Sequence, residues 1–68
     1  MHEWSAEITN DPERDYDVYV ELLYRDRYVG RIQRTITGEI VVEVYDKIEA
    51  PIPADWLMGV IKRAIAEL

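Results

Sequence analysis

The chain has 68 residues, 49% of them hydrophobic, and a formal net charge of −6 at pH 7. This length allows a single domain over residues 1–68, and five Tyr and two Trp residues are typical of a chain that folds. The absence of Cys excludes disulfides, a thiolate metal site and a Cys nucleophile, while the acidic balance disfavours nucleic-acid binding.

The first half of the chain contains two segments in which apolar and polar side chains alternate. Residues 3–9 alternate with a period of two, which predicts a half-buried strand. Residues 10–15 combine Pro12 with Asn and Asp side chains, as turns do. Residues 16–24 alternate again and predict a second strand, so the chain reverses between the two.

Two further alternating segments follow at short intervals. A connection of three residues at 25–27 leads into a third predicted strand at 28–35. A second break at 36–38 contains Gly38 and precedes a fourth strand at 40–45. Connections this short predict an antiparallel meander.

The C-terminal segment has the periodicity of a helix. Pro53 suits the first turn, and Asp55 adds a favourable negative charge near the N-terminus. One half of the helical surface holds Trp56, Leu57, Val60, Ile61, Ala64, Ile65 and Leu68. The sequence therefore predicts an α+β fold, in which a four-stranded antiparallel meander sheet carries one C-terminal helix packed on one face (ββββα).

The predicted loop lengths define which residues lie opposite one another. Opposed residues share a face of the sheet, so a consistent register gathers the apolar positions on one side. A row at the centre of this side comprises Ala6, Val20, Ile32 and Val42, and the neighbouring row comprises Trp4, Leu22, Gly30 and Val44. We expect the helix to cover this face, with Gly30 leaving space for Trp56 or Val60.

The opposite, helix-free face contains the candidate interaction residues. The predicted registers align Ser5, Glu21, Arg31 and Glu43, so that Arg31 lies between two carboxylates. Beside this row, a single helix leaves apolar and aromatic side chains uncovered, and such a patch often marks an interface. The interaction face is predicted to comprise Tyr19, Leu23, Val29, Arg31, Val41 and Tyr45.

These patterns favour a small acidic, non-catalytic protein-interaction module that acts through the helix-free face. The partner is either a second copy of the chain, giving a homodimer, or another protein, and an acidic binder of this size suits a basic partner. The alternative is binding of a single-stranded nucleic acid or a small ligand on the same face, where Tyr19, Arg31 and Tyr45 could stack on bases.

Other activities find little support in the residues. His2 is the single histidine and lies in a terminus that we expect to be mobile, so no catalytic triad is predicted. Acidic residues at 11, 13, 15 and 17 resemble a calcium loop, but Tyr16 and Leu22 stand where an EF-hand needs Gly and Glu. We expect no catalytic residues, no metal and no cofactor.

The N-terminal sequence indicates where the protein acts. MHEWSAEITN lacks the basic region and apolar stretch of a signal peptide, and the apolar runs are too short to span a membrane. We therefore expect a cytoplasmic protein without membrane association.

Overall fold

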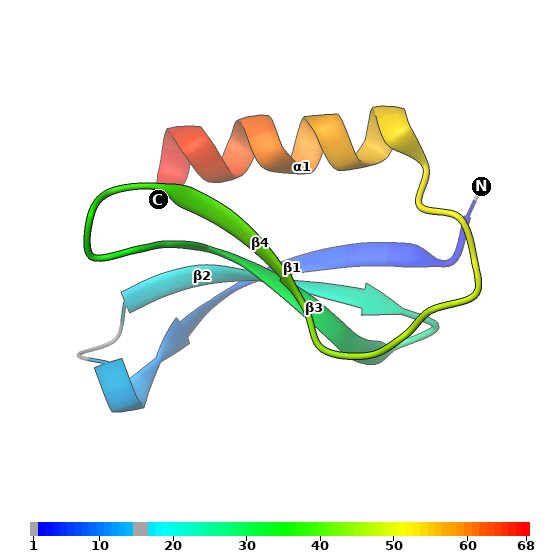
Figure 1. Ribbon diagram of the computed structural model, residues 1–68, viewed down its shortest axis with the longest axis horizontal. Helices are drawn as coiled ribbons and strands as arrows, with labels where there is room; N and C mark the ends of the chain where they lie inside the picture. The colour runs from blue at the N-terminus through cyan, green and yellow to red at the C-terminus, as the bar shows by residue number, and fades with distance from the viewer. Residues whose placement is uncertain (1, 15–16) are drawn as a thin grey trace.

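The computed structural model describes residues 2–14 and 17–68, which form one open sheet and one helix (Figure 1). The elements are β1 (Trp4–Asp11), a 3-10 turn (Pro12–Arg14), β2 (Asp17–Tyr24), β3 (Arg27–Arg34), β4 (Ile40–Val44) and α1 (Ala54–Glu67). Each strand pairs antiparallel with the next, in the order β1-β2-β3-β4. The predicted ββββα architecture is confirmed, while the predicted strand start at Tyr16 lies outside the described residues.

Helix α1 covers the middle of the sheet and leaves much of the two edge strands open. Val20, Leu22 and Ile32 are buried against Ala64, and this core is completed by Ile40, Trp56, Val60, Ile61 and Leu68. A helix about 10–12 Å wide covers roughly two strands spaced about 4.8 Å apart. The prediction of one continuous buried face is therefore wrong at the edge strands, where Ile8, Val42 and Val44 are 50%, 46% and 56% exposed.

The β1–β2 register differs from the predicted one by two residues. Val20 lies opposite Ile8, where the sequence predicted Ala6, because pairing continues to Asp11 and Asp17 before the chain turns. The 3-10 turn begins at Pro12, which delays the reversal. A shift by an even number leaves every side chain on its predicted face but changes its neighbours.

A β-bulge interrupts the β2–β3 hairpin. Leu22 faces Gly30 as predicted, but Leu23 then faces Tyr28, so Val29 is the extra residue of β3. The hairpin closes through two residues, Arg25 and Asp26, which both have positive φ, at 51° and 64°. The predicted three-residue loop is wrong because this tight turn takes Arg27 into β3.

Gly30 marks the place where β4 comes closest to β3. A Cβ atom on Gly30 would lie 2.5 Å from the backbone oxygen of Glu43, closer than real Cβ contacts. The glycine therefore accommodates the neighbouring strand, not the helix side chain that we predicted. The β3–β4 register itself is as predicted, with Ile32 opposite Val42 and Arg34 opposite Ile40.

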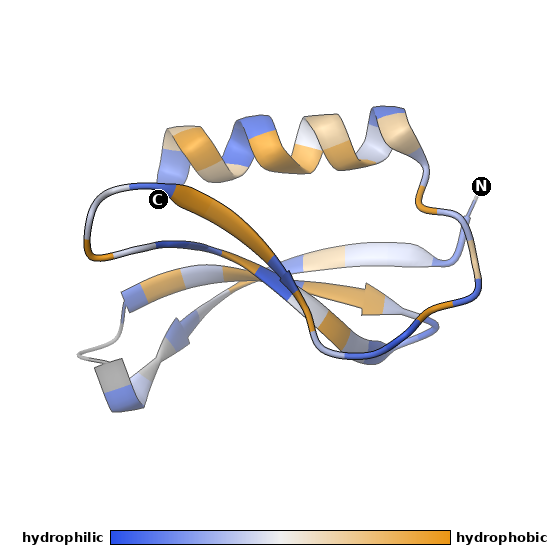
Figure 2. Ribbon diagram, viewed as in Figure 1, coloured by the Kyte–Doolittle hydropathy of each residue, from blue (hydrophilic) through white to orange (hydrophobic). Residues whose placement is uncertain are grey.

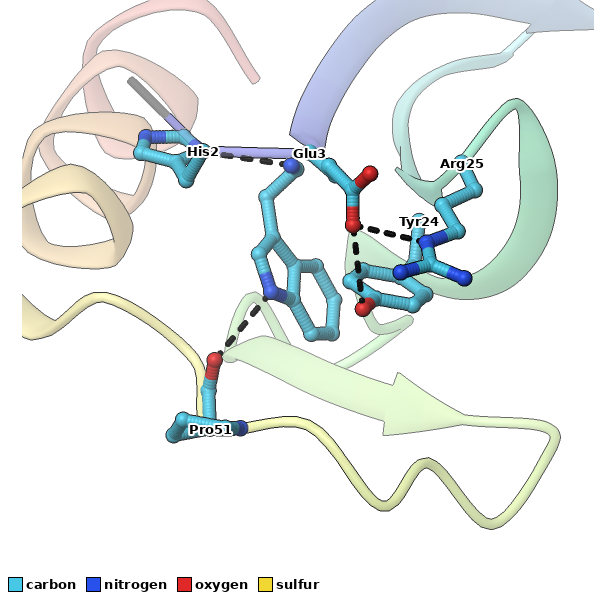
Figure 3. A network of polar contacts seen from close by, with 6 residues as sticks. His2, Glu3, Tyr24, Arg25 and Pro51 are labelled. Carbon is cyan, nitrogen blue, oxygen red and sulfur yellow. Dashed lines mark hydrogen bonds and ion pairs between the residues drawn. The ribbon is translucent and has the colours of Figure 1, made fainter.

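The N-terminal residues contact the connection that precedes α1 (Figure 3). The indole Nε1 of Trp4 donates a hydrogen bond to the backbone oxygen of Pro51 (3.2 Å), and the Trp4 ring lies 5.9 Å from that of Trp56. His2 accepts a hydrogen bond from the backbone N–H of Trp4 and contacts Trp56 edge-on. The His2 ring, for which the sequence predicted no role, thus contacts both Trp4 and Trp56.

Candidate interaction site on the helix-free face

The helix-free face is organised around one row of charged residues across all four strands. Glu21 faces Arg31, and Arg31 faces Glu43, as the sequence predicted. On the other side of Glu21, however, the shifted register places Glu7 where Ser5 was predicted. Two carboxylates thus stand directly opposite each other on β1 and β2, an arrangement that is destabilising unless something offsets it.

Arg31 makes its closest contacts with two tyrosines. Its guanidinium carbon lies 4.6 Å from the ring centroid of Tyr19 and 5.3 Å from that of Tyr45. Its Nε also donates a hydrogen bond to the Tyr45 hydroxyl. This hydrogen bond is the largest cause that raises the pKa of Arg31, to which the charge of Glu21 adds. Arg31 therefore holds the aromatic residues of the face together and keeps its positive charge.

Tyr28 extends over β2 from its position on β3. The bulge pairs it with Leu23 and so places it on the helix-free face, whereas the predicted alternation assigned it to the helix side. Its hydroxyl lies 3.4 Å from Oε2 of Glu7, to which it donates a hydrogen bond. Because β2 lies between β3 and β1, the Tyr28 side chain must cross β2 to reach Glu7.

The predicted apolar patch on this face is not exposed. Leu23 and Val29 are 5% and 2% exposed, so the expectation that they lie open to a partner is wrong. Neither residue belongs to the core beneath α1. Leu23 lies opposite Tyr28, and the backbone oxygen of Val29 accepts a hydrogen bond from the N–H of Tyr45. The chain after β4 runs past the end of the β2–β3 hairpin, and Asp46 of this segment forms an ion pair with Arg27 (Figure 1).

A shallow cavity of about 270 Å³ remains on this face at the β1–β2 end of the charged row. Its walls are formed by side chains of three strands, namely Glu7, Thr9, Tyr19, Glu21 and Tyr28. Glu21 is only 7% exposed, and its Oε2 atom has no hydrogen-bond partner among the described residues. We refer to this cavity as the Glu21 pocket.

The electrostatic character of the Glu21 pocket is negative. The charge of Glu7 is the largest cause that raises the pKa of Tyr28 above its ordinary value of 10.0, followed by desolvation, the hydrogen bond to Glu7 and the charge of Glu21. A phenol that resists ionisation reports a site where additional negative charge is unfavourable. The pocket thus combines carboxylates with two aromatic walls.

The predicted site residues are only partly brought together. Tyr19 lines the Glu21 pocket and contacts Arg31, while Tyr45 is 42% exposed on the other side of Arg31. Val41 is half-buried on β4 opposite Gln33. The sequence reasoning missed Tyr28, Glu7 and Thr9, because their place on this face depends on the bulge and on the length of the first turn.

Comparisons with known proteins give no further assignment. No protein-family model, curated protein or solved structure matches the chain. Within residues 2–14 and 17–68, no helix is long and apolar enough to cross a membrane. In the same part of the chain, no three His, Cys, Asp or Glu side chains gather as a metal site would require.

Proposed function

We propose that the protein is a non-catalytic interaction module whose helix-free face binds a positively charged side chain of a partner protein. The observation that carries this proposal is the buried Glu21 carboxylate, whose Oε2 atom has no hydrogen-bond partner in the described structure. A buried polar atom without a partner costs about 1–3 kcal/mol, and more when it is charged. Oε2 itself is buried, so the Glu21 carboxylate would have to turn toward a cationic side chain in the pocket for an N–H group to remove this cost.

The walls of the Glu21 pocket suit an ammonium or guanidinium group. Cations are attracted to the faces of aromatic rings, and Tyr19 and Tyr28 both line the pocket. Glu7 and Glu21 supply two negative charges on the same side. A bound cation would therefore also relieve the repulsion between these opposed carboxylates.

The overall charge supports a basic protein partner over a nucleic acid. A net charge of −6 attracts a basic surface at long range and repels phosphate. Bases would have to stack on Tyr19 and Tyr45, but the Arg31 guanidinium already lies against both rings. A base could therefore stack only on the ring faces that Arg31 leaves open.

Amide chemical shifts of the ¹⁵N-labelled protein test this proposal. A Lys-rich peptide, a Glu-rich peptide of the same length and a single-stranded RNA are titrated separately. We expect the Lys-rich peptide alone to shift the amides of Thr9, Glu21 and Tyr28. Bound cations should also lower the pKa of Tyr28, which an ultraviolet titration of tyrosinate measures.

A matched pair of variants separates the pocket from general charge attraction. Glu21→Gln and Glu43→Gln each remove one carboxylate from the same row, on opposite sides of Arg31. We expect Glu21→Gln to weaken binding of the Lys-rich peptide about tenfold, or about 1.4 kcal/mol, and Glu43→Gln to leave it nearly unchanged. Equal weakening by both variants, or a response to RNA instead, would contradict the proposal.

A further inference from the structure

Strand β4 is an edge strand with an apolar sequence. Four of its five residues are Ile or Val, and its one charged residue, Glu43, lies in the row on the helix-free face. Natural edge strands are usually protected from pairing by Lys, Pro, a bulge or a covering element. β4 contains neither Lys nor Pro, and its pairing with β3 is regular.

Alternate residues of β4 have backbone N–H and C=O groups that point away from β3, and the side chains of these residues lie on the helix side of the sheet. Tyr45 donates its N–H to Val29, and Glu39 accepts from Thr35, so the odd-numbered residues bond to β3. Hydrogen-bonded positions alternate along an antiparallel pair. The N–H and C=O groups of Ile40, Val42 and Val44 therefore point away from the sheet.

The other edge of the sheet differs in this respect. On β1 the outward-facing N–H of Trp4 already donates to the His2 ring, at 3.2 Å. Glu3, which directly precedes β1, and Glu7 of β1 each accept a hydrogen bond from a residue of the β2–β3 hairpin. The two edges are therefore not equivalent, and β4 is the one better suited to accept a further strand.

The side of α1 that faces β4 adds apolar surface to this edge. Ala64 is fully buried and marks the inward direction of the helix. At about 100° per residue, Arg63 lies to one side of Ala64, where it lines a cavity with Ile8 of β1. Met58 and Ile65 lie to the other side, on the β4 flank, and are 55% and 56% exposed.

We propose that the protein forms a homodimer in which β4 pairs antiparallel with β4 of a second copy around a two-fold axis at Val42. Figure 2 shows β4 as hydrophobic along most of its length, as this pairing requires. Val42 then faces Val42 of the other copy as a hydrogen-bonded pair, and Ile40 faces Val44. On the helix-free face, Glu43 meets Val41 and not a second Glu43, so the register opposes no like charges.

The spacing of the helices is compatible with this arrangement. Helix α1 lies over β2 and β3, so the two helix axes would be about four strand spacings, or about 19 Å, apart. Two helices, each about 10–12 Å wide with side chains, fit side by side over this distance. Met58 and Ile65 would fill the space between them, above Val42 and Val44, so the exposed apolar residues of this flank become buried.

The dimer would continue the sheet and extend the proposed function. A two-fold axis perpendicular to the sheet leaves both helices on one side and both helix-free faces on the other. Two Glu21 pockets would then open on the same surface. A partner with two basic side chains could occupy both pockets and gain affinity through the linkage. The dimer itself requires no ligand and is tested separately.

Sedimentation equilibrium at micromolar concentration tests the dimer. We expect the parent to sediment with twice the mass of one chain, and Val42→Lys to be monomeric because it would oppose two ammonium groups at the axis. Ile8→Lys is the control, since Ile8 is similarly exposed on the other edge strand, and it should remain dimeric. Circular dichroism checks that both variants fold. A monomeric parent, or a dimeric Val42→Lys variant, would overturn the proposal.

Single cysteines test the register independently. The chain has no cysteine of its own, so each variant carries one thiol. In the proposed pairing two Val42→Cys residues face each other with Cα atoms about 5.5 Å apart, within the range for a disulfide. Mild oxidation should therefore cross-link Val42→Cys but not Glu43→Cys, which faces Val41. Cross-linking of Glu43→Cys at an equal or higher rate would refute this register.

Discussion

Gly30→Ala adds one methyl group at the point where β3 and β4 come closest. The new Cβ would lie 2.5 Å from the Glu43 backbone oxygen and 3.5 Å from Val44 Cα. Real Cβ atoms essentially never approach another atom closer than 3.0 Å, so one strand must move. Because the Glu43 oxygen belongs to the backbone of a paired strand, a side-chain rotation cannot relieve the overlap. We expect a loss of about 1–3 kcal/mol in the free energy of unfolding.

Gly59→Ala provides the matched control. A Cβ at Gly59 meets nothing within 4 Å, and the residue lies inside α1. The same substitution should here stabilise the protein by about 0.5–1 kcal/mol, because alanine favours the helix. Thermal melts of both variants, at one protein concentration because a dimer adds concentration dependence, measure the difference. Each kcal/mol corresponds to roughly 4–8 °C in a domain of this size. If Gly30→Ala melts at or above the parent, β4 does not set the requirement for glycine.

Three further predictions concern charged side chains. Arg31→Met should lower the free energy of unfolding by about 1 kcal/mol, because its contacts with Tyr19 and Tyr45 are lost. Added salt should change this loss of stability little, whereas a strong salt response would indicate that Arg31 pairs with carboxylates. Glu21→Leu removes a buried carboxylate oxygen without a partner, so it should raise the free energy of urea unfolding by about 1–2 kcal/mol and abolish binding of the Lys-rich peptide. A destabilised variant would contradict the absence of a partner for Oε2. The hydrogen bond from Arg25 holds the pKa of Glu3 in the folded protein below its ordinary value of 4.5, so Glu3 stabilises the fold above pH 4.5, and this contribution is lost as the pH falls through the pKa of the folded state. Glu3→Gln should therefore lower the melting temperature near neutral pH but not in acid. An equal loss at neutral and at acid pH would argue against the ion pair.

The order and type of the elements could be predicted from the sequence, because the alternation of apolar and polar residues indicates a strand even where the predicted loop length is wrong. Val20, Leu22 and Ile32 fall on the helix side in the predicted register and in the observed one. The first hairpin was misplaced by two residues, which preserves this parity. The extent of burial was harder to predict, because it depends on how many strands a single helix can cover, and Val42 and Val44 lie beyond that width.

The Glu21 pocket could not be predicted from alternation alone. Tyr28 reaches the helix-free face through a bulge, and a bulge shifts parity by one residue within a strand. The available signal was weak, since the tight turn at Arg25 and Asp26 lacks the Asn-Gly or Asp-Gly pair that usually marks it. The juxtaposition of Glu7 with Glu21 follows from where Pro12 places the reversal, a detail of turn geometry that periodicity does not contain.

Because Trp4 contacts the C-terminal part of the chain, intrinsic tryptophan fluorescence should report on folding of the protein. Trp4 and Pro51 are 47 positions apart, so their hydrogen bond closes a loop that spans most of the chain. Contacts this distant in sequence slow folding, since the chain entropy is lost before they form. The two indoles, 5.9 Å apart, come together only when α1 reaches the sheet. The change in tryptophan fluorescence should therefore follow docking of the helix on the sheet. Far-ultraviolet circular dichroism should follow formation of the strands and the helix themselves.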